Sequence, residues 1–125
     1  MEENQKQCVL FCSPDRLIQK IIKKRLKSEG CKVNVASNGN DALTLIEEGK
    51  INLMVTEEML PFKSGFEIIE ICDQKDIPSI IISDSDLENK ILEAFDLGAY
   101  DFIDKPYSPN ELVVRIKNIF KHHRA

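Results

Sequence analysis

Residues 8–30 read CVLFCSPDRLIQKIIKKRLKSEG, and this stretch contains one complete unit of the fold. Its first five residues are all apolar, as expected of a parallel strand that is covered on both faces. Ser13 then offers a helix N-cap, and Pro14 follows at the first helical position. Apolar residues recur at helical spacing until Gly30 ends the helix, namely Leu17, Ile18, Ile21, Ile22 and Leu26. The stretch therefore predicts a buried strand followed by an amphipathic helix.

The same order of strand and helix occurs four more times along the chain. Further strands are predicted around 33–35, 53–55, 79–83 and 100–103, and the first of these alternates in polarity as an edge strand does. Helices are predicted over 41–48, from 65 through 71, from 86 to Gly98 and from 109 through 120. Three of these helices follow the Ser-x-x-Glu pattern of a capping box, at Ser64, Ser85 and Ser108.

Five alternating strand–helix units predict an α/β domain with a parallel sheet, right-handed crossovers and helices on both faces. We therefore expect the flavodoxin-like (βα)5 fold, a three-layer sandwich with strand order 2-1-3-4-5. A length of 125 residues corresponds to one ordinary domain, so the sequence predicts a single domain over 1–125 with its core at about 7–120. Hydrophobic residues make up 42% of the chain and charged residues 30%, a balance that excludes a disordered protein.

Composition and charge also narrow the range of partners. No apolar run is long enough to cross a membrane, and residues 1–4 do not resemble a signal peptide, so we expect a cytoplasmic protein. The net charge of −4 is uneven, with +2 over residues 1–50 and −6 over residues 51–125, and an acidic second half argues against nucleic-acid binding. We interpret the basic residues of the first helix as a solvated face: Lys20, Lys23, Lys24, Arg25 and Lys27.

Motifs of common enzymes and cofactor sites are missing from the sequence. It contains neither a G-x-G-x-x-G fingerprint nor a P-loop, and its only histidines, His122 and His123, lie at the C-terminal end. A Ser–His or Cys–His pair therefore cannot form in the body of the domain. The four cysteines contain no C-x-x-C pair and are expected to be buried like small apolar residues. We expect no enzymatic activity, no resident metal and no cofactor.

Ligands of this fold bind beyond the carboxyl ends of the strands, at the switch point between the first and third strands. The residues expected near that edge are Ser13, Pro14, Asp15, Thr56, Glu57, Glu58, Ser83, Asp84 and Lys105. Lysine and serine side chains there could hold an anionic phosphoryl oxygen. A simple ion pair between Lys105 and Glu57 explains the same residues equally well, and spacing alone does not separate the two interpretations.

The sequence resembles a receiver domain of the bacterial two-component response regulators, from about residue 7 to residue 120. Four segments carry the resemblance: NLMVTEEMLP at 52–61, SGFE at 64–67, IIIS at 80–83 and LGAYDFIDKP at 97–106. The resemblance implies an aspartate at the end of strand 3 that takes a phosphoryl group from a histidine kinase. It further implies an acidic pair after strand 1 that holds Mg²⁺, a hydroxyl after strand 4, an aromatic switch residue and a lysine after strand 5.

Only half of the implied site is present in this sequence. Ser83, Phe102 and Lys105 match the hydroxyl, the aromatic residue and the lysine. Glu57 stands in the acceptor position, however, and Ser13 and Pro14 replace the acidic pair, while Asp15 comes one position too late. The resemblance therefore implies a pseudo-receiver with weak or no Mg²⁺ binding, in which Glu57 imitates the phosphorylated state. It also implies a cis peptide bond at Lys105–Pro106.

Two other readings of the sequence stay open at this point. One is a working receiver that uses Glu57, Glu58 or Asp84 as an unorthodox acceptor, and the other is a flavodoxin-like cofactor binder. The expected partners of a pseudo-receiver are a sensor histidine kinase or another signalling protein, and the chain is expected to be the N-terminal part of a longer protein. The resemblance also implies a weak symmetric homodimer through the fourth helix, the fifth strand and the last helix, with Asp101, Glu111 and Arg115 as its candidate interface residues.

Overall fold

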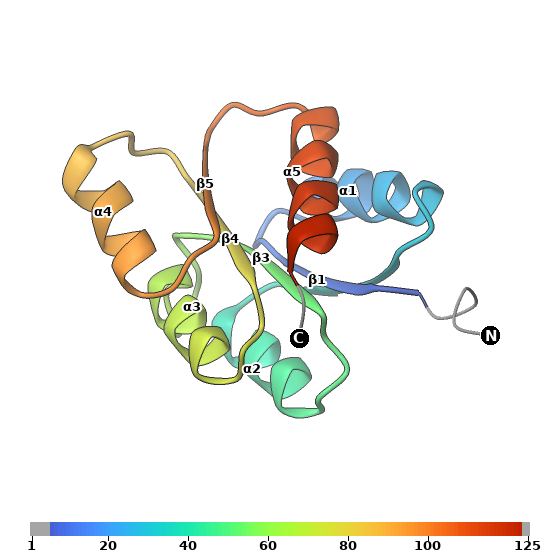
Figure 1. Ribbon diagram of the computed structural model, residues 1–125, viewed down its shortest axis with the longest axis horizontal. Helices are drawn as coiled ribbons and strands as arrows, with labels where there is room; N and C mark the ends of the chain where they lie inside the picture. Colours follow the sequence, from blue (N-terminus) through green and yellow to red (C-terminus); the bar gives the residue numbers. More distant parts are fainter. Residues whose placement is uncertain (1–5, 124–125) are drawn as a thin grey trace.

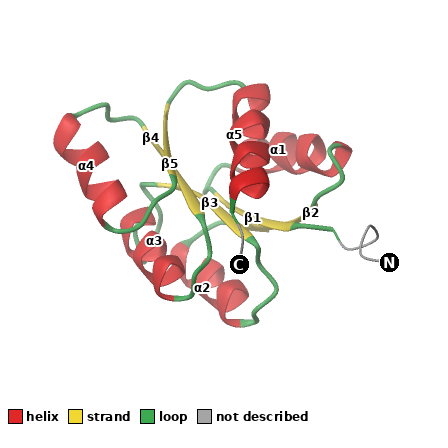
Figure 2. Cartoon of the chain, in the orientation of Figure 1, coloured by secondary structure: helices red, strands yellow, loops and turns green. Residues whose placement is uncertain are grey.

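The computed structural model describes residues 6–123, which fold into alternating strands and helices (Figures 1 and 2). The outermost residues of the predicted domain, 1–5 and 124–125, lie outside the described part. They include residues 1–4, on which the expectation of no signal peptide rests. The strands are β1 (Cys8–Cys12), β2 (Lys32–Ala36), β3 (Leu53–Glu57), β4 (Ser79–Ser83) and β5 (Asp101–Asp104). The helices are α1 (Arg16–Ser28), α2 (Gly39–Glu47), α3 (Gly65–Gln74), α4 (Glu88–Asp96) and α5 (Pro109–His122).

The five strands form one parallel sheet in the order β2-β1-β3-β4-β5, which confirms the predicted flavodoxin-like fold and the edge position of β2. In the register of the sheet, Cys12 lies beside Ala36 and Thr56, Glu57 beside Ile82, and Ser83 beside Asp104. Because parallel strands all end on the same side, the residues that follow them meet along one edge of the sheet.

Helices cover both faces of the sheet, as Figure 1 shows. Alternate strand residues such as Val9, Phe11 and Val55 pack against α1 and α5, while Leu10 and Met54 pack against α2 and α3. A smaller cluster joins α3 and α4 over β4, and Ala94 is the only α4 residue that is fully buried. Helix α4 is thus the least embedded of the helices. No helix over residues 6–123 is both long enough and apolar enough to traverse a lipid bilayer.

Two of the predicted helix caps are wrong. Ser13 does not cap α1, because its backbone still extends the sheet by donating its N–H to the Ala36 carbonyl. The cap is Asp15, whose side chain accepts hydrogen bonds from the amides of Leu17 and Ile18. The capping box predicted at Ser85 does not form either.

The reason at Ser85 is local, since its hydroxyl accepts the Leu87 amide two residues on and closes a turn of its own. Helix α4 consequently begins at Glu88 without a side-chain cap. The other two caps are confirmed: Ser64 and Glu67 form a reciprocal capping box, and Ser108 caps α5 with proline in its first turn.

The cysteines are free, and three of them, Cys8, Cys12 and Cys72, are buried as predicted. Burial raises the pKa of the Cys12 and Cys72 thiols to about 12, so both are neutral at physiological pH.

Candidate functional site

The carboxyl edge of the sheet carries two separate groups of polar side chains, one on each face. Side chains alternate along a strand, so Glu57 follows Val55 toward α1 and α5, whereas Glu58 turns to the face covered by α3 and α4. By the same alternation Lys105 shares a face with Glu57, and Ser83 shares a face with Glu58. Both glutamates are only 7% exposed.

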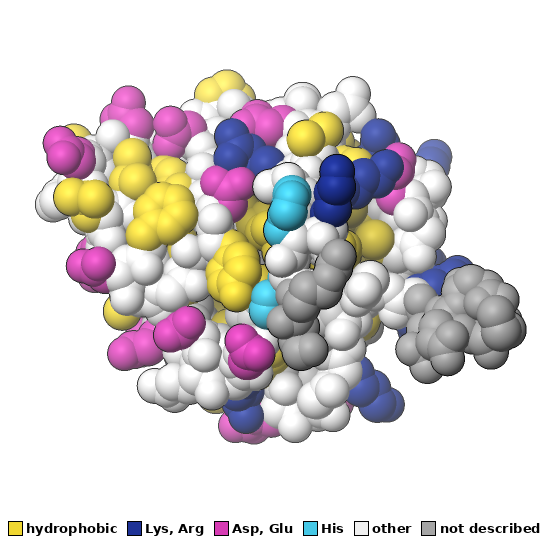
Figure 3. All heavy atoms as spheres, in the orientation of Figure 1, with side chains coloured by type: hydrophobic (Ala, Val, Ile, Leu, Met, Phe, Trp, Pro, Cys, Tyr) yellow, Lys and Arg dark blue, Asp and Glu magenta, His cyan; other side chains and the backbone are white. Residues whose placement is uncertain are grey.

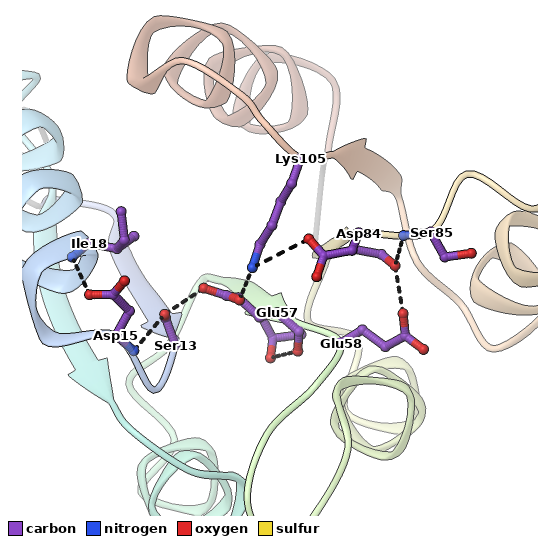
Figure 4. A network of polar contacts seen from close by, with 10 residues as sticks. Ser13, Asp15, Ile18, Glu57, Glu58, Asp84, Ser85 and Lys105 are labelled. Carbon is purple, nitrogen blue, oxygen red and sulfur yellow. Dashed lines mark hydrogen bonds and ion pairs between the residues drawn. The ribbon is translucent and has the colours of Figure 1, made fainter.

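In the first group Glu57 is bound through both of its carboxylate oxygens (Figure 4). Ser13 donates its hydroxyl to Glu57 Oε2 at 2.5 Å, and the Lys105 ammonium forms a hydrogen-bonded ion pair with Oε1. Asp84 stands 4.0 Å from the same ammonium but is largely exposed. The ion pair between Lys105 and Glu57, one of the two interpretations of the sequence, is therefore present. Ser13 adds a second hydrogen bond to the same carboxylate.

In the second group Glu58 joins β4 to α4. The hydroxyl of Ser83 donates to Glu58 Oε1 at 2.6 Å, and the Lys90 ammonium pairs with Oε2. Burial by itself raises the pKa of the Glu58 carboxyl, but the hydrogen bonds from Lys90 and Ser83 outweigh it and leave that pKa lowered. The hydrogen bond to Glu58 also raises the pKa of Lys90. Both partners are therefore charged at neutral pH.

The resemblance matches Ser83 to the hydroxyl that binds a phosphoryl oxygen in the family. Its hydroxyl is directed to Glu58 rather than to Glu57. Phe102 lies on the same face as Ser83 and packs against the cluster of Ile69, Ile81 and Ala94. Glu58 and Lys90 are thus the site residues that the sequence analysis did not identify as a pair. The alternation of side chains along β3 and β4 is the signal that could have placed Glu58 on the same face as Ser83, but it does not place Lys90, which lies on α4.

Neighbouring backbone fixes the two glutamates in place. The amide of Gly65, at the start of α3, donates to the Glu58 carbonyl at 2.8 Å, and a Cβ added at Gly65 would stand 2.3 Å from the Glu57 carbonyl oxygen. Only glycine permits this close approach of α3 to the end of β3. On the other side, the buried Gln19 side chain donates to the Ser13 carbonyl at 2.6 Å and holds the loop after β1.

The donors present at the edge do not fit Mg²⁺, which requires several placed oxygen ligands. Pro14 has no side-chain oxygen, and the Asp15 carboxylate is turned away to cap α1. The oxygens of Glu57 already face Ser13 and Lys105. Within residues 6–123, no three His, Cys, Asp or Glu side chains are grouped as a metal site requires.

Beside Glu57 lies an open groove of about 730 Å³ between α1 and the loop that leads into α5. Its lining combines Glu57 and Lys105 with apolar residues, among them Ile18, Ile21 and Tyr107. The Tyr107 hydroxyl is buried and has no hydrogen-bond partner within the described part of the chain. Burial, with a smaller effect of the Glu57 charge, raises the pKa of Tyr107 to about 12. The peptide bond between Lys105 and Pro106, at the start of this loop, is cis as predicted.

The three candidate interface residues contact one another within the chain. Arg115 of α5 donates two hydrogen bonds to the Asp101 carboxylate, both at 2.8 Å, and two to Glu111, at 3.1 and 3.3 Å. The hydrogen bond to Asp101 is the main reason why the pKa of Arg115 is raised. These residues thus connect α5 to β5 of the same chain.

Comparison with known proteins assigns a family to this arrangement. A family model described as the response regulator receiver domain matches residues 9–117. The receiver domain of a Francisella response regulator is similar to the chain at 28% identity and a TM-score of 0.88, over 95% of this chain and 100% of that one. The non-phosphorylated HemR receiver domain from Leptospira biflexa is similar at 26% identity and a TM-score of 0.88, over 96% and 98% of the two chains. A CheY-like receiver domain protein from Methanospirillum hungatei shares the fold at 24% identity and a TM-score of 0.88, over 94% and 95% of the two chains.

Proposed function

The chain belongs to the family of response regulator receiver domains, and from this premise we propose that it is a pseudo-receiver, a signalling module that accepts no phosphoryl group. In the family's chemistry, a carboxylate at the end of β3 attacks phosphorus while a bound metal ion neutralises the charge of the phosphoryl oxygens. The module proposed here acts through contacts with other proteins and is not an enzyme.

The observation that carries this proposal is the state of Glu57. One of its oxygens is bound by Lys105 and the other by Ser13, so each oxygen already accepts a hydrogen bond that an attack on phosphorus would have to disturb. The residues that replace the metal-binding pair, Ser13 and Pro14, supply no charge to position a metal ion. An incoming phosphoryl group would meet a carboxylate that already binds two donors, and Lys105 is the only cation among the described residues that line the groove.

We further infer that Glu58 holds the switch residues in one fixed arrangement. It provides the anion that the Ser83 hydroxyl binds, and Lys90 extends this contact to α4. The built-in imitation of phosphate therefore involves both glutamates, with Glu57 binding Lys105 and Glu58 binding Ser83. The signal from a module of this kind depends on whether the protein is present and on which partner it binds. It does not depend on a cycle of phosphorylation.

Phosphorylation by a small acyl-phosphate donor tests the proposal. After incubation with acetyl phosphate and Mg²⁺, the intact mass of the wild-type chain is expected to stay unchanged. The triple variant Ser13→Asp/Pro14→Asp/Glu57→Asp restores the acidic residues of the family pattern, and it is expected to gain one phosphoryl group only when Mg²⁺ is present. The matched control Ser13→Asp/Pro14→Asp keeps Glu57 and is expected to stay unmodified.

A phosphoryl adduct on the wild-type chain would contradict the proposal and favour an unorthodox acceptor. The variants Glu57→Gln, Glu58→Gln and Asp84→Asn would then identify the residue that carries the adduct, because only one of them would abolish it.

The proposed partner is a signalling protein such as a sensor histidine kinase, in the cytoplasm and without nucleic-acid contact by this domain. The symmetric dimer through α4, β5 and α5 stays a prediction. Its ion pairs would compete with the bonds that Arg115 makes to Asp101 and Glu111 in its own chain. Sedimentation of wild type against Arg115→Glu tests it, since a symmetric dimer of this kind dissociates in the variant.

A further inference from the structure

The outer surface of α1 presents a basic face around two exposed apolar residues. It consists of Leu17, Lys20, Ile21, Lys24 and Lys27, which recur every three or four residues and so form one stripe along the helix. Leu17 is 66% exposed and Ile21 43% exposed. The three lysines are exposed and form no ion pair within residues 6–123. We call this surface the basic α1 face.

Helix α4 presents the opposite pattern, here called the acidic α4 face. It consists of Glu88, Leu92, Glu93, Phe95 and Asp96, all of them exposed. Leu92 is 56% exposed and Phe95 44% exposed, although both are large apolar side chains. In the described part of the chain, its three carboxylates form no ion pair. Ala94 alone of this helix is fully buried, so α4 leaves the large apolar side chains of Leu92 and Phe95 in contact with water.

The two faces match in size as well as in charge. Each carries two apolar side chains and three charges of one sign. At a rise of about 1.5 Å per residue, the stripe on α1 spans about 15 Å and the stripe on α4 about 12 Å.

The faces also lie far apart on the molecule. In Figure 1 the helices α1 and α4 stand at opposite ends of the longest axis, and Figure 3 shows apolar side chains beside acidic ones at the α4 end. A chain therefore cannot bring its own two faces together.

We propose that copies of this chain associate head to tail, with the basic α1 face of one copy seated on the acidic α4 face of the next. Leu17 and Ile21 then cover Leu92 and Phe95, and the lysines surround this contact opposite the three carboxylates. Complementary charge of this kind fixes orientation and repels a copy that is turned the wrong way. Since the faces are different and lie at opposite ends, the contact is heterologous and leaves one free face at each end for further copies.

Sedimentation velocity of the full chain tests this association. The weight-average sedimentation coefficient is expected to rise with protein concentration without levelling off at the dimer value. It is expected to fall when the ionic strength is raised from about 0.05 M to about 0.5 M, because salt screens the exposed charges.

Charge reversal distinguishes this contact from a symmetric one. Lys20→Glu/Lys24→Glu makes both faces acidic, and Glu93→Lys/Asp96→Lys makes both basic, so each variant alone is expected to associate at least about tenfold more weakly. Lysines at 93 and 96 lie near the C-terminal end of α4, where cations favour the helix, so folding should be preserved. Mixed in equal amounts, the two variants are expected to associate again. The control Lys50→Glu/Lys75→Glu replaces two exposed lysines outside both faces, and it changes the net charge by the same amount as Lys20→Glu/Lys24→Glu. This control is expected to behave like wild type.

Three outcomes would overturn the proposal. The first is a wild-type chain that stays monomeric over the whole concentration range. The second is a plateau at the dimer that Arg115→Glu abolishes and Lys20→Glu/Lys24→Glu does not, because it would assign the contact to the symmetric face. The third is a mixture of the two reversed variants that fails to associate.

Discussion

Glu57 and Glu58 are adjacent in the sequence, yet their carboxylates belong to different groups. Glu57 binds Ser13 and Lys105 on one face of the sheet, and Glu58 binds Ser83 and Lys90 on the other. The difference arises from the pleat of a β-strand, which sends successive side chains to opposite faces. An inserted or deleted residue in β3 would exchange these partners.

The Glu58 carboxylate is expected to make stability depend on pH. Its pKa in the folded state lies below the ordinary value of 4.5. The contribution of this carboxylate to the free energy of unfolding is therefore fully present above about pH 4.5. It is lost as the pH falls through the lower pKa of the folded state. Glu58→Gln removes the charge opposite Lys90 and is expected to lower the free energy of unfolding by about 1–2 kcal/mol at pH 7.

Urea unfolding at pH 7 and at pH 3 measures this effect. The difference between wild type and Glu58→Gln is expected to be smaller at pH 3 than at pH 7, because below the ordinary pKa of 4.5 the stabilisation by the charged carboxylate is progressively lost. Glu70→Gln is the control, because Glu70 is exposed on α3 and forms no ion pair within residues 6–123. An equal difference at both pH values would show that the Glu58 charge does not contribute.

At the scale of the helices, the start of α1 depends on Asp15. Its carboxylate accepts two amide hydrogen bonds and lies at the positive end of the helix dipole. Asp15→Ala is therefore expected to lower the free energy of unfolding by about 1 kcal/mol, while Asp15→Asn keeps most of the cap. Thermal or urea unfolding of both variants measures this, with Asp86→Ala in an exposed loop as the control. If Asp15→Ala matched wild type, the cap would be contributing nothing to folding.

The caps also show where sequence patterns are reliable and where they are not. Ser64 and Ser108 cap their helices as predicted, since each is followed directly by a helical turn. Ser85 has the same Ser-x-x-Glu pattern and Ser13 precedes a proline as Ser108 does, but a sheet contact at Ser13 and a local turn at Ser85 prevent both caps. The backbone of Ser13 still belongs to the sheet, and the Ser85 hydroxyl closes a turn before α4.

At the scale of the whole molecule, the sequence predicts the fold and most of the edge residues. The strand order, the two-sided burial of β1, β3 and β4 and the meeting of Glu57 with Lys105 all follow from apolar periodicity and parallel topology. The contact of Ser83 with Glu58 follows only when the alternation of faces along β3 and β4 is taken into account. The contact of Lys90 with Glu58 depends on where α4 packs and does not follow from spacing. Nor does spacing show that Arg115 is bound within its own chain.

The molecule as a whole is expected not to be stabilised by Mg²⁺. A ligand that binds only the folded state raises its stability in proportion to the logarithm of its concentration above the Kd. Since the edge carries no suitable set of oxygen ligands, about 10 mM MgCl₂ should leave the Tm equal to that in NaCl of the same ionic strength. Circular dichroism during heating measures this. The triple variant with restored aspartates is the positive control, and a rise in wild-type Tm that saturates below about 1 mM Mg²⁺ would contradict the expectation.

The ring of Tyr107, half-buried beside Glu57, gives the protein an optical property of practical use. The chain contains no tryptophan and only two tyrosines, so one half of its tyrosine chromophores stands at the groove. Ultraviolet absorbance and tyrosine fluorescence of the unmodified chain therefore respond to whatever enters that groove or alters the charge next to it. Small molecules and peptides could be screened by light alone, without a dye, a tag or an added residue.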